Sequence, residues 1–146
     1  MKALLFLLLF SALVGHAQQR QQVKGNPVHQ LRIYEIFEHN KDAFHQRFND
    51  HAQRIMKQYD FHIIAMWETN TNGKLAFVYL LEWPDVQVLQ ASWDKFMADE
   101  EWARIKQETS RLHGQLVGEI QDIRMAAVPY SPLMNFKEIM DTARDK

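Results

Sequence analysis

Residues 61–83, FHIIAMWETNTNGKLAFVYLLEW, hold two apolar segments on either side of a short polar one. Residues 61–68 and 75–83 are rich in branched and aromatic side chains, which is the composition of β-strands. The polar residues 69–74 between them include Asn72-Gly73, and Asn-Gly is the strongest short-range signal for a hairpin turn. The stretch therefore predicts two antiparallel strands that are joined by a tight turn.

A strand and a helix are predicted before this hairpin. Residues 28–37 (VHQLRIYEIF) have the composition of a strand. Asn40 is the expected N-cap of the next helix, which we expect to end near Tyr59, and Asp42 places a negative charge in its first turn. The apolar stripe of this helix consists of Phe44, Phe48, His51, Ala52 and Ile55.

The two faces of the first strand differ, because side chains alternate along a strand. One face is apolar and is expected to join the core; it consists of Leu31, Ile33 and Phe37. The other face is polar and aromatic, with Gln30, Arg32 and Tyr34. We expect this second face to line a ligand pocket or a subunit interface.

Two helices and a fourth strand are predicted after the hairpin. Pro84-Asp85 begins one helix and Asp99 caps the next, while residues 117–128 form the last strand. The apolar stripes of the two helices consist of Val86, Leu89, Trp93, Phe96 and Met97, and of Trp102, Ile105, Thr109, Leu112 and Leu116.

The predicted order of elements is that of the split βαβ, or ferredoxin-like, α+β fold. In this fold the helices cover one face of a four-stranded antiparallel sheet. The open face is expected to carry the polar and aromatic side of the first strand together with the aromatic third strand, and soluble monomers rarely expose so large a patch. Two copies related by a two-fold axis would cover it, so we expect a homodimer.

The first 17 residues have the pattern of a secretory signal peptide: Lys2, an apolar run at residues 3–14, and the small residues of Gly15-His16-Ala17. A membrane anchor is the alternative, but the run is shorter than the roughly 18–20 residues that span a bilayer. We expect cleavage after Ala17, export to the periplasm or beyond the cell, and no membrane association afterwards. Residues 18–27 are predicted to be a flexible spacer, and residues 134–146 a C-terminal helix or tail.

The composition of the chain excludes several classes of protein. The 146 residues are 47% hydrophobic and 24% charged, which suits one globular domain. The absence of cysteine excludes disulfides, thiolate metal sites and a lipid-anchored lipoprotein. A net charge of −1 without a basic run gives no reason to expect a nucleic-acid partner.

Several stretches together resemble the NIPSNAP family. The first strand (VHQLRIY, residues 28–34) is similar to its opening motif, and Ala65-Met66-Trp67 to its segment before the hairpin. Asp99-Glu100-Glu101-Trp102 resembles its Asp-Pro-Glu-Trp segment, with Glu100 in the place of proline. The aromatic strand at residues 75–83 and the Tyr-Ser-Pro-Leu ending at residues 130–133 also resemble the family, so the resemblance covers residues 28–133.

The resemblance implies a dimeric α+β barrel, a fold shared with small monooxygenases, haem-degrading enzymes and chlorite dismutases. It supplies no catalytic residues. Many members have two domains in tandem, whereas this chain has one, which favours a homodimer.

Three histidines recur every six residues, but they are not expected to bind one metal ion. His39, His45 and His51 step about 120° apart around a helix of 100° per residue. Only His51 falls on the apolar stripe. It is either a histidine at the helix–sheet boundary that is hydrogen-bonded to a backbone carbonyl, a general base, or an axial haem ligand.

The remaining candidates belong to strands. Arg32 is a fixed cation for an anionic ligand and Tyr34 a hydrogen-bond donor to a ligand carbonyl, or both form a polar layer between subunits. Trp67, Tyr79 and Trp83 either form the wall of an aromatic pocket or belong to the core or an interface.

These features favour an exported protein that binds a small apolar or aromatic ligand in a homodimeric barrel, without a resident cofactor. The alternatives are a cofactor-independent monooxygenase or isomerase, in which His51 acts as the base, and a haem-binding protein, in which His51 is the ligand.

Overall fold

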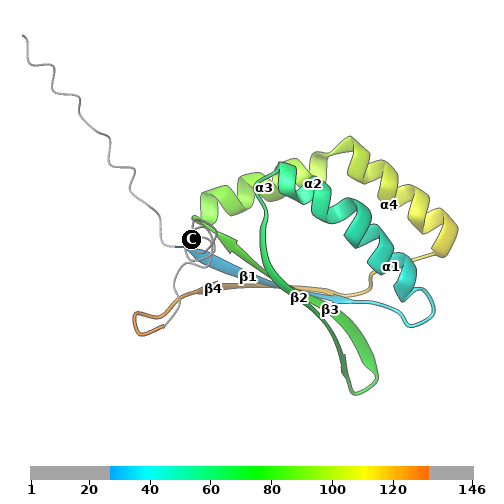
Figure 1. Cartoon of the computed structure of the whole chain (residues 1–146), viewed down its shortest axis with the longest axis horizontal. Helices are drawn as coiled ribbons and strands as arrows, with labels where there is room; N and C mark the ends of the chain where they lie inside the picture. Colours follow the sequence, from blue (N-terminus) through cyan, green and yellow to red (C-terminus); the bar gives the residue numbers. More distant parts are fainter. Residues whose placement is uncertain (1–26, 132–146) are drawn as a thin grey trace, which may run out of the picture.

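The computed structural model describes residues 27–131 of the chain, and these form a sheet with helices on one side (Figure 1). The strands are β1 (Val28–Glu35), β2 (His62–Thr71), β3 (Lys74–Trp83) and β4 (Ile120–Ala126). All pairings are antiparallel, and the strand order is β2-β3-β1-β4. This order is that of the ferredoxin-like α+β fold, so the predicted fold class is confirmed.

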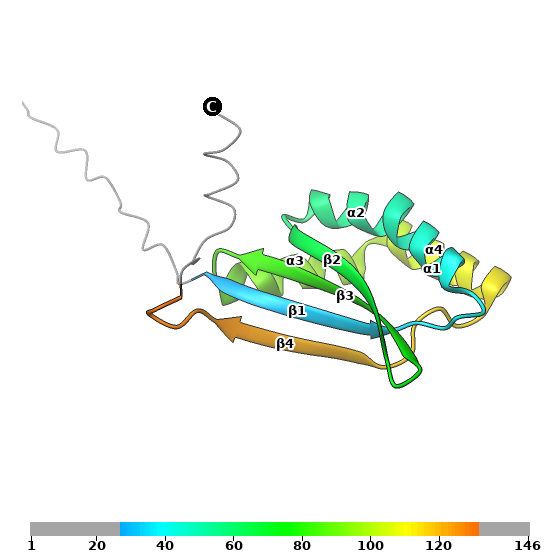
Figure 2. The same cartoon turned by 60° about the horizontal axis from the view of Figure 1, so that its bottom comes forward.

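The helical part consists of α1 (Lys41–Arg47), η1 (Phe48–Ala52), α2 (Gln53–Gln58), α3 (Val86–Ala98) and α4 (Glu100–His113). Figure 2 shows the helices stacked over the same face of the sheet, while the opposite face has no described helix over it. We call the face that the helices cover the helix side, and the opposite face the open face. Among residues 27–131, no helix is both long and apolar enough to cross a bilayer.

The predicted first helix contains a π-helical segment, η1, between α1 and α2. A π-turn takes up more residues than an α-turn, so it changes which side chains line up along the helix. Phe44, Phe48, Ala52 and Ile55 are buried as predicted, whereas His51 is only half-buried. The prediction that His51 belongs to the buried stripe is therefore only partly correct, because its side chain remains partly exposed.

The hairpin confirms the predicted Asn-Gly turn. Asn72 and Gly73 have positive φ angles of 54° and 79°, the conformation that a two-residue hairpin loop needs. The side chain of Asn70 accepts a hydrogen bond from the Gly73 amide. The strands reach the turn itself, so the predicted loop at residues 69–74 is reduced to two residues.

The predicted cap Asp99 is present, and Asp85, predicted to begin a helix, also caps it. The Asp85 carboxylate accepts a hydrogen bond from the Val88 amide at 2.8 Å, and that of Asp99 accepts one from the Trp102 amide at 2.7 Å. The hydroxyl of Tyr59 also donates to Asp99, and this hydrogen bond is the main cause that lowers the pKa of the carboxyl.

Asn40 stands at the N-cap position of α1, but its side chain makes no capping hydrogen bond. Its amide instead donates to the carbonyls of His113 (2.9 Å) and Gln115 (3.0 Å) at the end of α4. The residue therefore ties the start of one helix to the end of another, which local sequence could not indicate.

The face of β1 that was predicted to join the core lies on the open side of the sheet. Residues paired across a sheet share a face, and Gln30, Arg32 and Tyr34 pair with Leu81, Tyr79 and Phe77 of the buried core. Leu31 and Ile33 therefore point away from the helices. The prediction was wrong because β3 supplies the large apolar side chains under the helices, which leaves room for polar ones from β1.

Three members of the predicted helix stripes are exposed rather than buried: Val86, Met97 and Leu112. The central members Leu89, Phe96, Trp102 and Ile105 are buried as predicted. The predicted C-terminal helix, the spacer up to residue 26 and the signal peptide lie outside the described residues.

Replacing Asn40 with alanine is expected to lower the free energy of unfolding by about 1–3 kcal/mol, because two hydrogen bonds between helices are lost. The change is measurable by urea unfolding. Asn49→Ala is the control, since Asn49 is exposed and, within residues 27–131, its side chain bonds only to those of Asp50 and Gln53. Equal stability of the two variants would show that the tie between helices contributes nothing.

Candidate functional site

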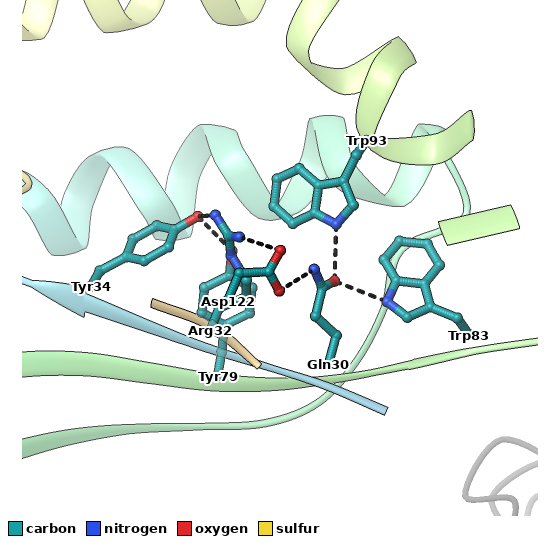
Figure 3. A network of polar contacts seen from close by, with 7 residues as sticks. All are labelled: Gln30, Arg32, Tyr34, Tyr79, Trp83, Trp93 and Asp122. Carbon is teal, nitrogen blue, oxygen red and sulfur yellow. Dashed lines mark hydrogen bonds and ion pairs between the residues drawn. The ribbon is translucent and has the colours of Figure 1, made fainter. Parts of the chain in front are cut away.

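A polar network fills part of the space between the helix side of the sheet and α3 (Figure 3). Gln30, Arg32 and Tyr34 alternate along β1 and so point to the same side. Asp122 of β4 pairs with Arg32 in register and reaches the same space. The network is therefore a product of strand alternation and sheet order together.

Gln30 is the centre of the network and is fully buried. Its carbonyl oxygen accepts hydrogen bonds from the indole N–H groups of Trp83 (3.0 Å) and Trp93 (2.9 Å). Its amide nitrogen donates to the Asp122 carboxylate at 2.8 Å. One side chain thus joins β1, β3, β4 and α3 and satisfies polar groups on three of them.

Arg32 is a nearly buried cation with aromatic rings beside it; its side chain is 13% exposed. It forms an ion pair with Asp122 (3.1 Å), donates to the Tyr34 hydroxyl (3.3 Å), and lies 4.6 Å from the centre of the Trp93 ring. Burial alone would lower the pKa of Arg32, but Tyr34, Tyr79 and Asp122 outweigh it and raise the pKa. Arg32 therefore stays charged.

One N–H donor of Arg32 has no hydrogen-bond acceptor among the described residues. Its Nε atom is buried and has no hydrogen-bond partner within residues 27–131. A buried donor without an acceptor costs about 1–3 kcal/mol, so such atoms are rare and need an explanation.

Tyr34 and Tyr79 form a phenol pair. Their hydroxyl oxygens are 2.7 Å apart and their rings meet edge to face. Tyr79 is fully buried, and this burial raises its pKa well above the ordinary value, so its phenol keeps its proton. Either hydroxyl can be the donor in this pair, and when Tyr79 donates, the proton of Tyr34 is available to a ligand.

Four of the six predicted pocket residues come together in this network: Arg32, Tyr34, Tyr79 and Trp83. Trp67 does not, since it pairs with Val78 on the open face and is 51% exposed. His51 lies on η1 and takes part in none of the contacts of the network.

Sequence reasoning missed three members of the network as site residues. Gln30 was correctly grouped on one face with Arg32 and Tyr34, although that face was expected to be the open one, and it was given no role; Trp93 was assigned to the core. Asp122 was not singled out, because its partner on β1 depends on the register between β4 and β1. The signal for Gln30 was its alternation with Arg32 and Tyr34.

The described residues contain no cluster of three histidine or carboxylate side chains that could hold a metal ion. His45 hydrogen-bonds to Glu68 at 2.8 Å on the surface, and His39 stacks on Phe37.

A hollow of about 460 Å³ lies on the opposite side of the sheet, near the β2–β3 hairpin. Its floor includes Ile33 and Val78, and Glu35, Lys74 and Glu119 contribute charges around it. Because these residues belong to the open face, the hollow is separate from the polar network.

Replacing Gln30 with leucine is expected to lower the free energy of unfolding by about 2–5 kcal/mol, because the buried indole N–H of Trp83 and the part-buried one of Trp93 lose their acceptor. Urea unfolding followed by tryptophan fluorescence measures this. Gln90→Leu on the exposed surface of α3 is the control and should change stability by no more than about 0.5 kcal/mol. A loss no larger than that of Gln90→Leu would contradict the central role of Gln30.

Comparison with solved structures finds the same fold in NIPSNAP proteins. A NIPSNAP-like domain protein from Burkholderia xenovorans superposes with a TM-score of 0.60 at 21% identity, covering 75% of this chain and 92% of that one. A NIPSNAP family protein of unknown function from Agrobacterium tumefaciens gives 0.63 at 16% identity, covering 75% and 95%.

Some monooxygenase structures also match, including one from Streptomyces coelicolor. Its TM-score of 0.48 is too low to support any inference about this chain. No curated protein sequence matches this chain. The sequence pattern of the NIPSNAP family matches residues 29–132, which confirms the resemblance, and the chain belongs to the NIPSNAP family.

Proposed function

We propose that this protein binds a small aromatic or apolar ligand on the helix side of its sheet, with Arg32 and Tyr34 as polar anchors. The observation that carries the proposal is the state of Arg32, a nearly buried cation whose buried Nε donor has no acceptor in the described chain. A ligand oxygen would satisfy that donor.

The surroundings of Arg32 fit a ligand of this kind. A planar guanidinium binds carboxylates and carbonyls in a fixed geometry, and the Trp93 and Tyr34 rings beside it offer aromatic surface. Asp122, its present partner, is 34% exposed and belongs to an edge strand of the sheet. A ligand carboxylate could therefore exchange with Asp122 at low cost in packing.

Tyr34 supplies the second anchor. When Tyr79 is the donor in the phenol pair, the Tyr34 hydroxyl has its own proton to donate to a ligand carbonyl. The two anchors together select a molecule with an oxygen acceptor on an aromatic or apolar body.

The monooxygenase, isomerase and haem alternatives all depend on His51. No contact of His51 in the described chain favours them, because the network lies around Arg32 and Tyr34 instead.

We also propose that the chain is exported and acts as a homodimer. The N-terminal pattern supports export. The open face supports the dimer: its half-buried residues are Leu31, Ile33, Val78 and Leu80, and its exposed ones are Trp67, Ile123 and Met125. A two-fold pair of sheets would cover this apolar surface.

The ligand is testable by native mass spectrometry of the protein purified from its own host. The wild type is expected to carry a defined extra mass, and Arg32→Gln is expected to lose it. Arg54→Gln, which removes an exposed arginine on α2, should keep it. The same extra mass on Arg32→Gln would contradict the assignment of Arg32, and the chain mass would reveal whether cleavage occurs after Ala17.

The dimer is testable by sedimentation. The wild type is expected to sediment as a dimer, and Ile123→Asp as a monomer, because the new charge would be buried between the two sheets. Met97→Asp is the matched control, since Met97 is an exposed apolar residue on α3 rather than on the open face. A monomeric wild type, or loss of the dimer in both variants, would contradict an interface on the open face.

A further inference from the structure

Asp122 is the one carboxylate among the seven residues of the polar network, and both of its oxygens are engaged (Figure 3). Oδ2 lies 3.1 Å from Nη1 of Arg32, and Oδ1 accepts a hydrogen bond from the Gln30 amide at 2.8 Å. Asp122 pairs in register with Arg32, so β4 places its side chain directly beside the guanidinium. The protein thus supplies its own anion to this cation.

The ionic charges of the network are balanced. Arg32 is its one cation and Asp122 its one anion, while the other five members are amide, phenol and indole side chains. A nearly buried charge is tolerated when an opposite charge accompanies it. A ligand carboxylate beside the same guanidinium would place two anions on one cation. With Asp122 in place, the network therefore favours an uncharged ligand.

A carboxylate could bind Arg32 without this repulsion only by displacing Asp122, and Gln30 opposes that exchange. Asp122 lies on an edge strand and can move at little cost in packing, but Gln30 is fully buried. The Gln30 amide would lose its acceptor unless the ligand reached both Arg32 and Gln30 at once, and a buried donor without an acceptor is costly. The two hydrogen-bonded contacts thus keep Asp122 in its position.

The donor that is available to a ligand is not the one that Asp122 holds. Asp122 contacts Nη1 and Tyr34 contacts Nη2, whereas the buried Nε has no acceptor among the described residues. Nε carries a single N–H bond, which points along the edge of the guanidinium that Nη2 shares. One uncharged oxygen satisfies this donor, and such an oxygen would lie on the Tyr34 side of Arg32.

We propose that Asp122 is the specificity-determining residue of the site, and that the ligand is a neutral carbonyl compound rather than an acid. The carbonyl oxygen accepts from Nε of Arg32, and the charge of Asp122 repels carboxylates of the same size and shape. Discrimination of this kind comes from a repulsive element that is built into the site. The inference rests on the proposed function and narrows it, because Arg32 by itself suits a carboxylate at least as well as a ketone.

The test compares two naphthalenes of nearly equal shape by isothermal titration calorimetry at neutral pH. 2-Acetylnaphthalene is a neutral ketone, and 2-naphthoate has a carboxylate in place of the acetyl group. The wild type is expected to bind the ketone at least about tenfold more tightly, because a second carboxylate beside Asp122 is repelled.

Asp122→Asn removes the repelling charge and keeps an oxygen that can accept from Gln30. It should strengthen binding of 2-naphthoate by at least about tenfold and change binding of the ketone by less than about threefold. Glu119→Gln is the matched control, since Glu119 is exposed directly before β4 and lines the hollow on the open face. It should leave both affinities unchanged. A purely structural role of Asp122 would weaken binding of both probes and would not produce this selective gain.

The variants separate this inference from the proposed function. If Arg32→Gln weakens either probe but Asp122→Asn gives no selective gain for 2-naphthoate, the proposed site stands and the inference is overturned. A wild type that binds 2-naphthoate more tightly than the ketone also overturns it. If Arg32→Gln weakens neither probe, or the wild type binds neither, both proposals are overturned.

A second variant covers the case in which Asp122→Asn fails to fold. Asp122→Ser also removes the charge, keeps an acceptor for Gln30 and is held to the same criterion. Failure of both variants to fold would show that Asp122 is structural and overturn the inference.

Discussion

The architecture depends on the side-chain amide of Gln30. It accepts from two indole groups and donates to a carboxylate, and it does so where no water reaches it. A polar group in such a place is stabilising only when all its hydrogen bonds are made. Because those bonds go to β3, β4 and α3, they also fix how α3 sits on the sheet, and with it the position of Trp93 beside Arg32.

The polar network and the apolar open face have one common cause. Side chains alternate along β1, so placing Gln30, Arg32 and Tyr34 under the helices obliges Leu31 and Ile33 to lie on the other face. The large side chains of β3 and the helices complete the core without them. The candidate ligand site and the candidate dimer interface are therefore two consequences of a single register. A one-residue slip of β1 would move its polar side chains to the open face and its apolar ones under the helices.

Local patterns predicted the elements well, because the signals for them are local. Asn72-Gly73 gave the hairpin, and Asp85 and Asp99 gave two helix starts through hydrogen bonds to residues three positions away. Local patterns did not predict the contacts of Asn40. It stands at a helix N-cap as Asp85 and Asp99 do, but its side-chain amide donates to backbone carbonyls more than seventy residues later. The π-turn of η1 had no recognised local signal, so the position of His51 was predicted only in part.

By itself the sequence determined the order of strands and helices, the family, and the two residues, Arg32 and Tyr34, that share one face of the first strand. Only the tertiary structure decided which face of the sheet the helices cover, and so whether those residues lie inside the subunit or on its open face. It also brought Asp122 and Trp93 toward them. The physical reason is that alternation and helical period are set by neighbouring residues, whereas burial and ion pairing depend on elements that meet only when the chain is packed.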